Sequence, residues 1–247
     1  PAPPKTGNAA LDAALAMEIP LGQDRGLATD SGFRMQVPLP FEHALEDGID
    51  RLIIDMTGTE TYATCYVYPD RIDLAPSLAA FGGLGLDTIT SSLGDEPILT
   101  NEIIRVHGGH VSGTPYHGAE WITLSGKGSG HTKVLVGARP NGSLACIHMG
   151  LGLRQSFQSL FVRMLETFES PTVAPEPYFE EIAILRLGDH AVGLNWTYLL
   201  YDADGDTEFN VITSTFFPRG GTDVLASMSY DRGWSTNDGA LINRISI

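Results

Sequence analysis

Hydrophobic and polar side chains alternate over several short stretches of the chain, which is the pattern of half-buried β-strands. In residues 32–40 every second side chain from Phe33 to Val37 is apolar, and prolines close the stretch. Residues 50–58 and 61–75 are rich in β-branched and aromatic side chains, which favour strands. The pattern therefore predicts at least three strands in the first third of the chain.

A meander followed by a helix is the clearest pattern. Residues 119–124, 131–139 and 143–150 read as three strands, and an Asn-Gly pair at Asn141 marks a tight hairpin between the last two. Residues 153–168 then place apolar side chains at helical spacing along one stripe. An antiparallel sheet with this helix on one face would bury both apolar surfaces.

Two further stretches have helical character. Residues 8–19 predict a short helix with Asn8 as its N-cap. Residues 77–93 combine alanine and leucine with several glycines, which fits either a loose helix or a loop with a helical excursion.

The last third of the chain is predicted to be rich in strands. It follows a proline-rich stretch, residues 171–178, which reads as a stiff linker. Residues 179–247 echo the first meander, since Gly-x-x-Trp opens a strand in each, at Trp121 and at Trp196. The echo fits a diverged internal repeat, or the likeness that any two meanders share. Both tryptophans are interpreted as core anchors.

These elements predict an α+β fold, an antiparallel sheet with packed helices and a β-rich C-terminal extension that reads as a partial repeat. Residues 1–31 would form a leader and a short helix, and residues 32–170 an α+β sandwich domain. Residues 171–178 would link this domain to a β-rich unit, residues 179–247.

The order of elements from residue 32 to residue 170 resembles that of Mog1/PsbP-like proteins, a group that includes many small bacterial lipoproteins. The matching segments are "GFRMQVP", the paired strands around Cys65, "GTPYHGAEWITL", "TKVLVGARPNGSLACIHMG" and a closing helix that ends in "LETFES". The resemblance implies a compact antiparallel sheet flanked by helices, and binding or accessory roles more often than catalysis. The segment after Tyr178 lies outside this pattern.

Charge narrows the range of partners. The formal net charge is −15, and no basic cluster interrupts it. Nucleic-acid binding needs Lys and Arg to neutralise phosphates, so a nucleic-acid partner is not expected. A basic protein, a cation or a neutral small molecule stays open as a partner, and solubility alone also accounts for the charge.

The start of the chain bears on its location. It opens "PAPPKTGNAA", which resembles a solvated leader left after a signal peptide or lipoprotein signal is removed. A trimmed chain would look the same. No stretch approaches the roughly 20 apolar residues of a membrane span. We therefore expect a periplasmic or extracellular protein without a transmembrane segment, and a lipid anchor upstream of residue 1 fits this location.

The two cysteines, Cys65 and Cys146, each lie in an apolar run. Their spacing excludes a CxxC redox or zinc pair. They are either two buried free thiols or one disulfide between neighbouring strands, and the sequence alone does not decide between these.

Three histidines, His107, His110 and His117, fall within the glycine-rich stretch "HGGHVSGTPYH". In a strand, residues three apart point to opposite faces, so only a loop could bring all three onto one zinc ion, with Glu120 or His131 nearby. The alternative is a polar loop that shapes a binding surface.

An acidic stretch, "YDADGDTEF", offers Asp202, Asp204, Asp206 and Glu208. Calcium prefers such oxygen ligands, but the glycine and the final glutamate of an EF-hand are not at their required positions. The stretch therefore reads as an acidic hairpin tip, with surface calcium binding as the alternative.

Three hypotheses about function follow. The first is a non-enzymatic extracytoplasmic binding or accessory protein without a cofactor, which uses the surface around the three histidines for a protein or small-molecule partner. The second is a metal-dependent hydrolase in which the histidines hold zinc and Glu120 is the general base. The third is a structural module stabilised by calcium at the acidic stretch.

Overall fold

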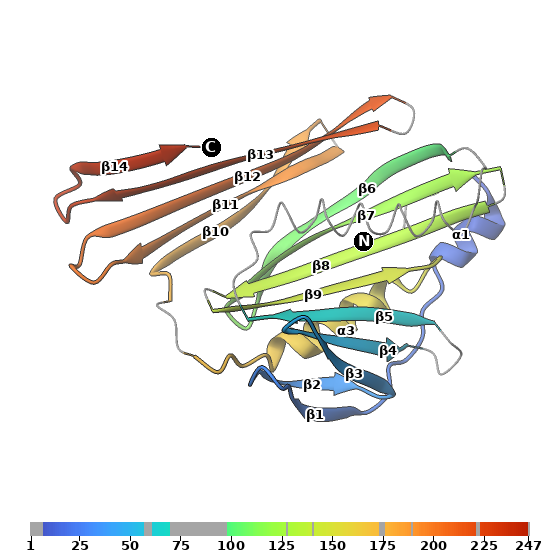
Figure 1. Ribbon diagram of the computed structural model, residues 1–247. Helices are drawn as coiled ribbons and strands as arrows, with labels where there is room; N and C mark the ends of the chain where they lie inside the picture. The colour runs from blue at the N-terminus through green and yellow to red at the C-terminus, as the bar shows by residue number, and fades with distance from the viewer. Residues whose placement is uncertain are drawn as a thin grey trace.

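A computed structural model describes residues 7–56, 61–69, 98–126, 128–139, 141–172, 176–188, 190–220 and 223–246 (Figure 1). The expected element at residues 77–93 lies outside these residues. The described residues form three antiparallel sheets and two helices, α1 (Ala9–Leu15) and α3 (Arg154–Glu166).

The largest sheet has seven strands in the order β3-β4-β5-β9-β8-β7-β6. All neighbouring strands in it are antiparallel. Its strands are β3 (Phe41–Glu46), β4 (Ile49–Asp55), β5 (Tyr62–Tyr68), β6 (Ile98–Val111), β7 (Thr114–Ser125), β8 (Gly128–Arg139) and β9 (Gly142–Met149).

The second sheet has five strands in sequence order, and a two-stranded hairpin completes the fold. The five strands are β10 (Phe179–Leu187), β11 (His190–Tyr201), β12 (Thr207–Gly220), β13 (Asp223–Ser235) and β14 (Leu241–Ser246), and the hairpin consists of β1 (Asp24–Ala28) and β2 (Arg34–Pro38).

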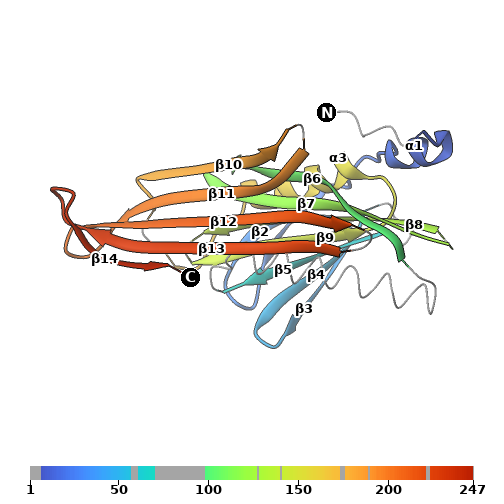
Figure 2. The ribbon, with the colours of Figure 1, turned by 90° about the horizontal axis from the view of Figure 1, so that it is seen from above.

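These elements stack in three layers, with the seven-stranded sheet in the middle (Figures 1 and 2). On one face it packs against α3 and the β1–β2 hairpin, and this interface holds Phe33, Leu52 and Phe161. On the other face it packs against the five-stranded sheet through a cluster that includes Val134 and Trp196. Because successive side chains of a strand point to opposite faces, the seven-stranded sheet contributes apolar side chains to both cores.

The predicted α+β class is wrong, because the described residues are mostly strand. The amphipathic helix is present as α3, and the helix predicted at residues 8–19 is reduced to the seven residues of α1. The stretch interpreted as a glycine-rich loop lies in β6 and β7 instead. A Cβ atom on Gly108 would come within 2.8 Å of Ile182 on β10, so glycine permits the close approach of the two sheets there.

No helix among the described residues is both long and apolar enough to cross a membrane.

Candidate functional site

The stretch "HGGHVSGTPYH" forms the hairpin between β6 and β7. Ser112 and Gly113 make its turn, with φ values of 48° and 76°, as in the two-residue turns that match the twist of antiparallel strands. His107 and His110 lie on β6, and His117 lies on β7.

The structure does not bring the three histidines together. His107 Nε2 contacts Glu120 Oε1 at 2.6 Å, whereas His110 Nε2 lies 3.5 Å from Glu180 of the five-stranded sheet. His117 pairs with Gly108 across the hairpin, on the face that packs against that sheet. Strand alternation places His107 on the opposite face from the other two, so the three imidazoles cannot share one metal ion.

A buried charge cluster, which we define as His107, Glu120, His131, Lys133 and Arg154, lies between the seven-stranded sheet and the start of α3. The Glu120 carboxylate accepts hydrogen bonds from three of its members. The distances are 2.6 Å from His107 Nε2, 3.0 Å from His131 Nε2 and 2.6 Å from Arg154 Nε. One carboxylate thereby ties β6, β7 and β8 to the first residue of α3.

Lys133 connects this cluster to the loop that precedes α3. Its ammonium group donates hydrogen bonds to the carbonyl oxygens of Gly150 and Gly152, each at 2.8 Å, and lies 3.4 Å from His131 Nδ1. Backbone carbonyls that would otherwise be buried without donors are satisfied in this way. The contacts fix the loop and the start of α3 on the sheet.

Burial sets the charge states in this region. Burial acts to raise the pKa of Glu120, but His107, His131 and Arg154 outweigh it and hold that pKa far below the usual range. Burial lowers the pKa of Lys133 to about 7, although the Glu120 charge opposes the shift. Burial also lowers the pKa of His131, so its neutral form donates to Glu120 from Nε2 and accepts from Lys133 at Nδ1.

The buried charge cluster has no room for a substrate. The cavity beside it, lined by His107, Glu120, Lys133, Arg154 and neighbouring apolar side chains, measures about 10 Å³. That is space for about one water molecule. Every titratable member of the cluster is less than 10% exposed. Glu120 therefore joins neighbouring elements in a closely packed, buried environment.

The sequence suggested Glu120 as a zinc neighbour or general base and His131 as a zinc neighbour, but it did not point to Lys133 or Arg154. The spacing of His131 and Lys133 indicates that they are neighbours. They are two residues apart in an apolar strand, so their side chains must point to the same face. The contribution of Arg154 depends on how the helix packs, which strand periodicity does not reveal.

The acidic stretch forms the turn between β11 and β12. Asp202 Oδ1 accepts hydrogen bonds from the backbone N–H groups of Asp204 and Asp206, both at 2.9 Å, as in an Asx turn. Glu208 instead accepts a hydrogen bond from Arg232 Nε at 2.8 Å. Within the described residues, neither this stretch nor the three histidines forms a group of three ligands close enough for one metal ion.

The two cysteines are bonded to each other. Cys65 on β5 lies directly opposite Cys146 on β9, and their sulfur atoms are 2.07 Å apart. Both side chains are fully buried in the core beneath α3.

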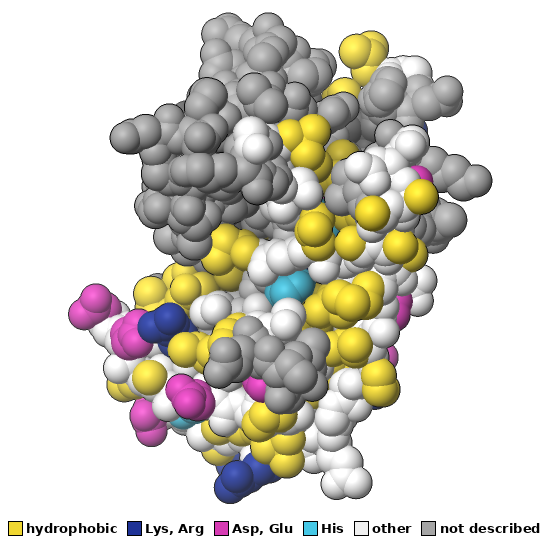
Figure 3. Space-filling view, turned by 90° about the vertical axis from the view of Figure 1, so that its right-hand side faces the viewer, with side chains coloured by type: hydrophobic (Ala, Val, Ile, Leu, Met, Phe, Trp, Pro, Cys, Tyr) yellow, Lys and Arg dark blue, Asp and Glu magenta, His cyan; other side chains and the backbone are white. Residues whose placement is uncertain are grey.

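An apolar groove lies at the end of the molecule that carries α1. We define it by Met17, Tyr62, Met149, Leu151 and Leu153, and it has a volume of about 410 Å³. Hydrophobic side chains gather on this end of the molecule (Figure 3). Met17, Tyr62 and Met149 are 48%, 47% and 38% exposed, whereas large apolar side chains of the core are below 10%.

Contacts around the start of α3 position this groove. The Glu18 carboxylate accepts hydrogen bonds from the backbone N–H groups of Gln155 and Ser156, at 2.9 and 2.7 Å. A negative charge is favourable at this end of a helix. The Met17 carbonyl accepts a hydrogen bond from the Leu153 N–H at 2.8 Å, so Met17 is held against the loop that forms one wall.

A second hollow, of about 580 Å³, is lined by residues of the β1–β2 hairpin and of the end of α3. Its lining includes the polar side chains of Arg34, Gln36, Glu166 and Glu169. Leu27, Ala28 and Met35 also line it, but none of its large apolar side chains is exposed as Met17, Tyr62 and Met149 are in the groove.

No protein-family model matches the chain, and no curated protein matches it. A solved structure from Bacteroides thetaiotaomicron VPI-5482, a crystal structure at 1.50 Å resolution, is similar to 68% of this chain with 10% sequence identity and a TM-score of 0.37. The similar region spans 55% of that protein. A likeness of this extent carries no argument about function.

Proposed function

We propose that this protein is a non-enzymatic binding or accessory protein that acts outside the cytoplasm and holds a small apolar molecule in the apolar groove. The observation that carries the proposal is the exposure of Met17, Tyr62 and Met149 around one hollow. Exposed apolar side chains that gather in a concave surface commonly mark ligand sites.

The dimensions and chemistry of the groove favour a small molecule. Its volume of about 410 Å³ falls in the range of small-molecule sites, roughly 300–1,000 Å³. Methionine side chains adapt to irregular apolar ligands because they are flexible and polarizable. The net charge of −15 favours a neutral or cationic ligand over an anionic one.

Two further features support a location outside the cytoplasm and a non-enzymatic role. A disulfide persists in oxidising compartments such as the periplasm, and Cys65 and Cys146 form one. The buried charge cluster, which contains the strongest concentration of titratable groups near the histidine hairpin, has space for about one water and so offers no reaction site.

The test is a fluorescence titration with N-phenyl-1-naphthylamine, a neutral apolar probe. We expect saturable enhancement, and we expect Met149→Lys to weaken binding at least tenfold, because a lysine in the groove must lose hydration. Leu241→Lys is the matched control, since Leu241 is 60% exposed and lies on β14, at the opposite end of the molecule (Figure 1). Equal binding by the two variants, or no enhancement at all, would contradict the proposal.

A further inference from the structure

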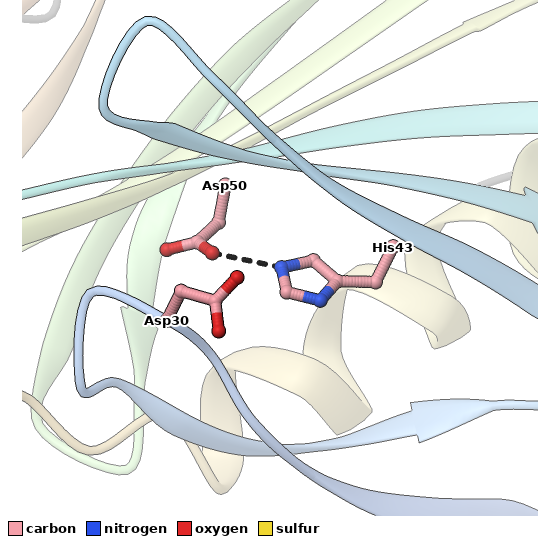
Figure 4. A group of neighbouring side chains, drawn as sticks. All are labelled: Asp30, His43 and Asp50. Carbon is pink, nitrogen blue, oxygen red and sulfur yellow. Dashed lines mark hydrogen bonds and ion pairs between the residues drawn. The ribbon is translucent and has the colours of Figure 1, made fainter.

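Three potential metal ligands from three different elements meet beside the β3–β4 hairpin. Asp30 lies in the turn between β1 and β2, His43 on β3 and Asp50 on β4. Each offers a ligand atom, and these atoms all lie within 4.8 Å of one another. The three side chains point toward one another (Figure 4).

The register of the hairpin explains how two of them meet. His43 pairs with Leu52 and Asp50 with Leu45, so His43 and Asp50 are diagonal neighbours on the same face. His43 Nε2 and Asp50 Oδ1 are 2.7 Å apart. The turn after β1 adds Asp30 from the neighbouring hairpin.

Asp50 is unusual because its carboxylate is fully buried, at 0% exposure. The hydroxyls of Ser31 and Thr29 also interact with this carboxylate, although its Oδ2 has no hydrogen bond of good geometry among the described residues. Arg51, the next residue along the chain, pairs with Glu46 instead. Hydroxyl groups do not balance the charge of a buried carboxylate that lies close to a second one, Asp30, and a bound cation would compensate it.

We propose that Asp30, His43 and Asp50 form a binding site for a divalent transition-metal ion such as zinc. One imidazole nitrogen with two carboxylates suits zinc better than calcium, which prefers six to eight oxygen ligands. Three protein ligands leave a fourth tetrahedral position, and the exposed Asp30 places it on the solvent side.

The His43–Asp50 pair requires only a small adjustment. Ligand atoms of a tetrahedral zinc ion lie roughly 3.3 Å apart when each bond is about 2.0–2.1 Å. His43 Nε2 and Asp50 Oδ1 would therefore separate by less than 1 Å from their present 2.7 Å. The metal would replace the proton that His43 shares with Asp50. This site shares no residue with the apolar groove, and either proposal can fail without the other.

The experiment is an isothermal titration of metal-free protein with zinc chloride, calcium chloride and magnesium chloride in turn. We expect one zinc ion per chain and much weaker binding of calcium and magnesium. Asp30→Asn and His43→Gln should each weaken zinc binding at least tenfold. Asp47→Asn is the matched control, because Asp47 is an exposed carboxylate in the β3–β4 turn and its φ of 52° suits asparagine equally well.

Cobalt supplies a second readout that is independent of affinity. Co²⁺ in place of zinc should give the visible absorption of a tetrahedral site, and His43→Gln should remove it while Asp47→Asn retains it. The proposal is overturned if zinc does not bind, if both site variants bind zinc as the unaltered protein does, or if calcium binds in preference to zinc.

Discussion

Among single residues, Glu120 combines a buried negative charge with several hydrogen bonds from neighbouring side chains. It is 2% exposed and carries three hydrogen bonds from charged or polar side chains, one of them from Arg154. Removing one member of a buried ion pair leaves the other charge without compensation, which costs more than the pair itself contributes.

We therefore expect Glu120→Gln to lower the free energy of unfolding by about 3–5 kcal/mol. The matched control is Glu46→Gln, which removes a surface ion pair with Arg51 and should cost less than about 1 kcal/mol. Urea unfolding followed by circular dichroism measures both. Similar losses in the two variants would show that the buried charge cluster does not hold α3 on the sheet.

His148 should make stability depend on pH. Burial, helped by the charge of Lys133, lowers its pKa to about 3, whereas a histidine in the unfolded chain titrates near 6.5. Between these values the unfolded chain binds a proton that the folded protein does not, so stability falls as the pH drops from about 6.5 toward 3.

His148→Phe keeps an aromatic ring beside Phe157 and removes this titration. We expect the loss of unfolding free energy between pH 6.5 and pH 4.5 to be about 2 kcal/mol smaller in this variant than in the unaltered protein. Urea unfolding at the two pH values provides the comparison. An unchanged difference would mean that other groups cause the acid sensitivity.

At the scale of elements, the disulfide joins β5 to β9 across the middle of the seven-stranded sheet, and the two cysteines are 81 residues apart in sequence. A bond that closes so long a loop restricts the unfolded chain strongly. Reduction should therefore lower the free energy of unfolding by about 2–5 kcal/mol.

Unfolding with and without a phosphine reductant measures this loss. The double variant Cys65→Ala/Cys146→Ala is the control, because the reductant should have no effect on it. Alkylation of the denatured, unreduced protein followed by mass spectrometry should label neither cysteine. Labelling of both cysteines would contradict the disulfide.

Elements with strong local patterns could be predicted from sequence. The apolar stripe at residues 153–168 gave α3, and the Asn-Gly pair gave the β8–β9 hairpin. The hairpin of β6 and β7 could not be predicted from local sequence, because Gly108 and Gly109 weaken any strand preference. Those residues pair as strands because β7 and the five-stranded sheet surround them, and such long-range packing is not visible in local sequence.

At the scale of the whole molecule, the candidate sites depend on contacts between distant segments. Met17 and Met149 both line the apolar groove although they are far apart in the sequence. Asp30 reaches His43 and Asp50 only because the β1–β2 hairpin lies next to β3 and β4 (Figure 1). Residue type and spacing along the chain predict neither arrangement.

Methionine methyl groups can report directly whether the apolar groove binds a ligand. The chain has six methionines. Met17 and Met149 line the groove, whereas Met35, Met56 and Met164 are buried in the core beneath the seven-stranded sheet.

The decisive measurement is an NMR titration of protein labelled with ¹³C at the methionine methyl groups, with N-phenyl-1-naphthylamine as the ligand. We expect the Met17 and Met149 signals to shift together in a saturable manner, while those of Met35, Met56 and Met164 stay in place. Shifts confined to other methionines, or no saturable shift of Met17 and Met149, would contradict ligand binding in the apolar groove.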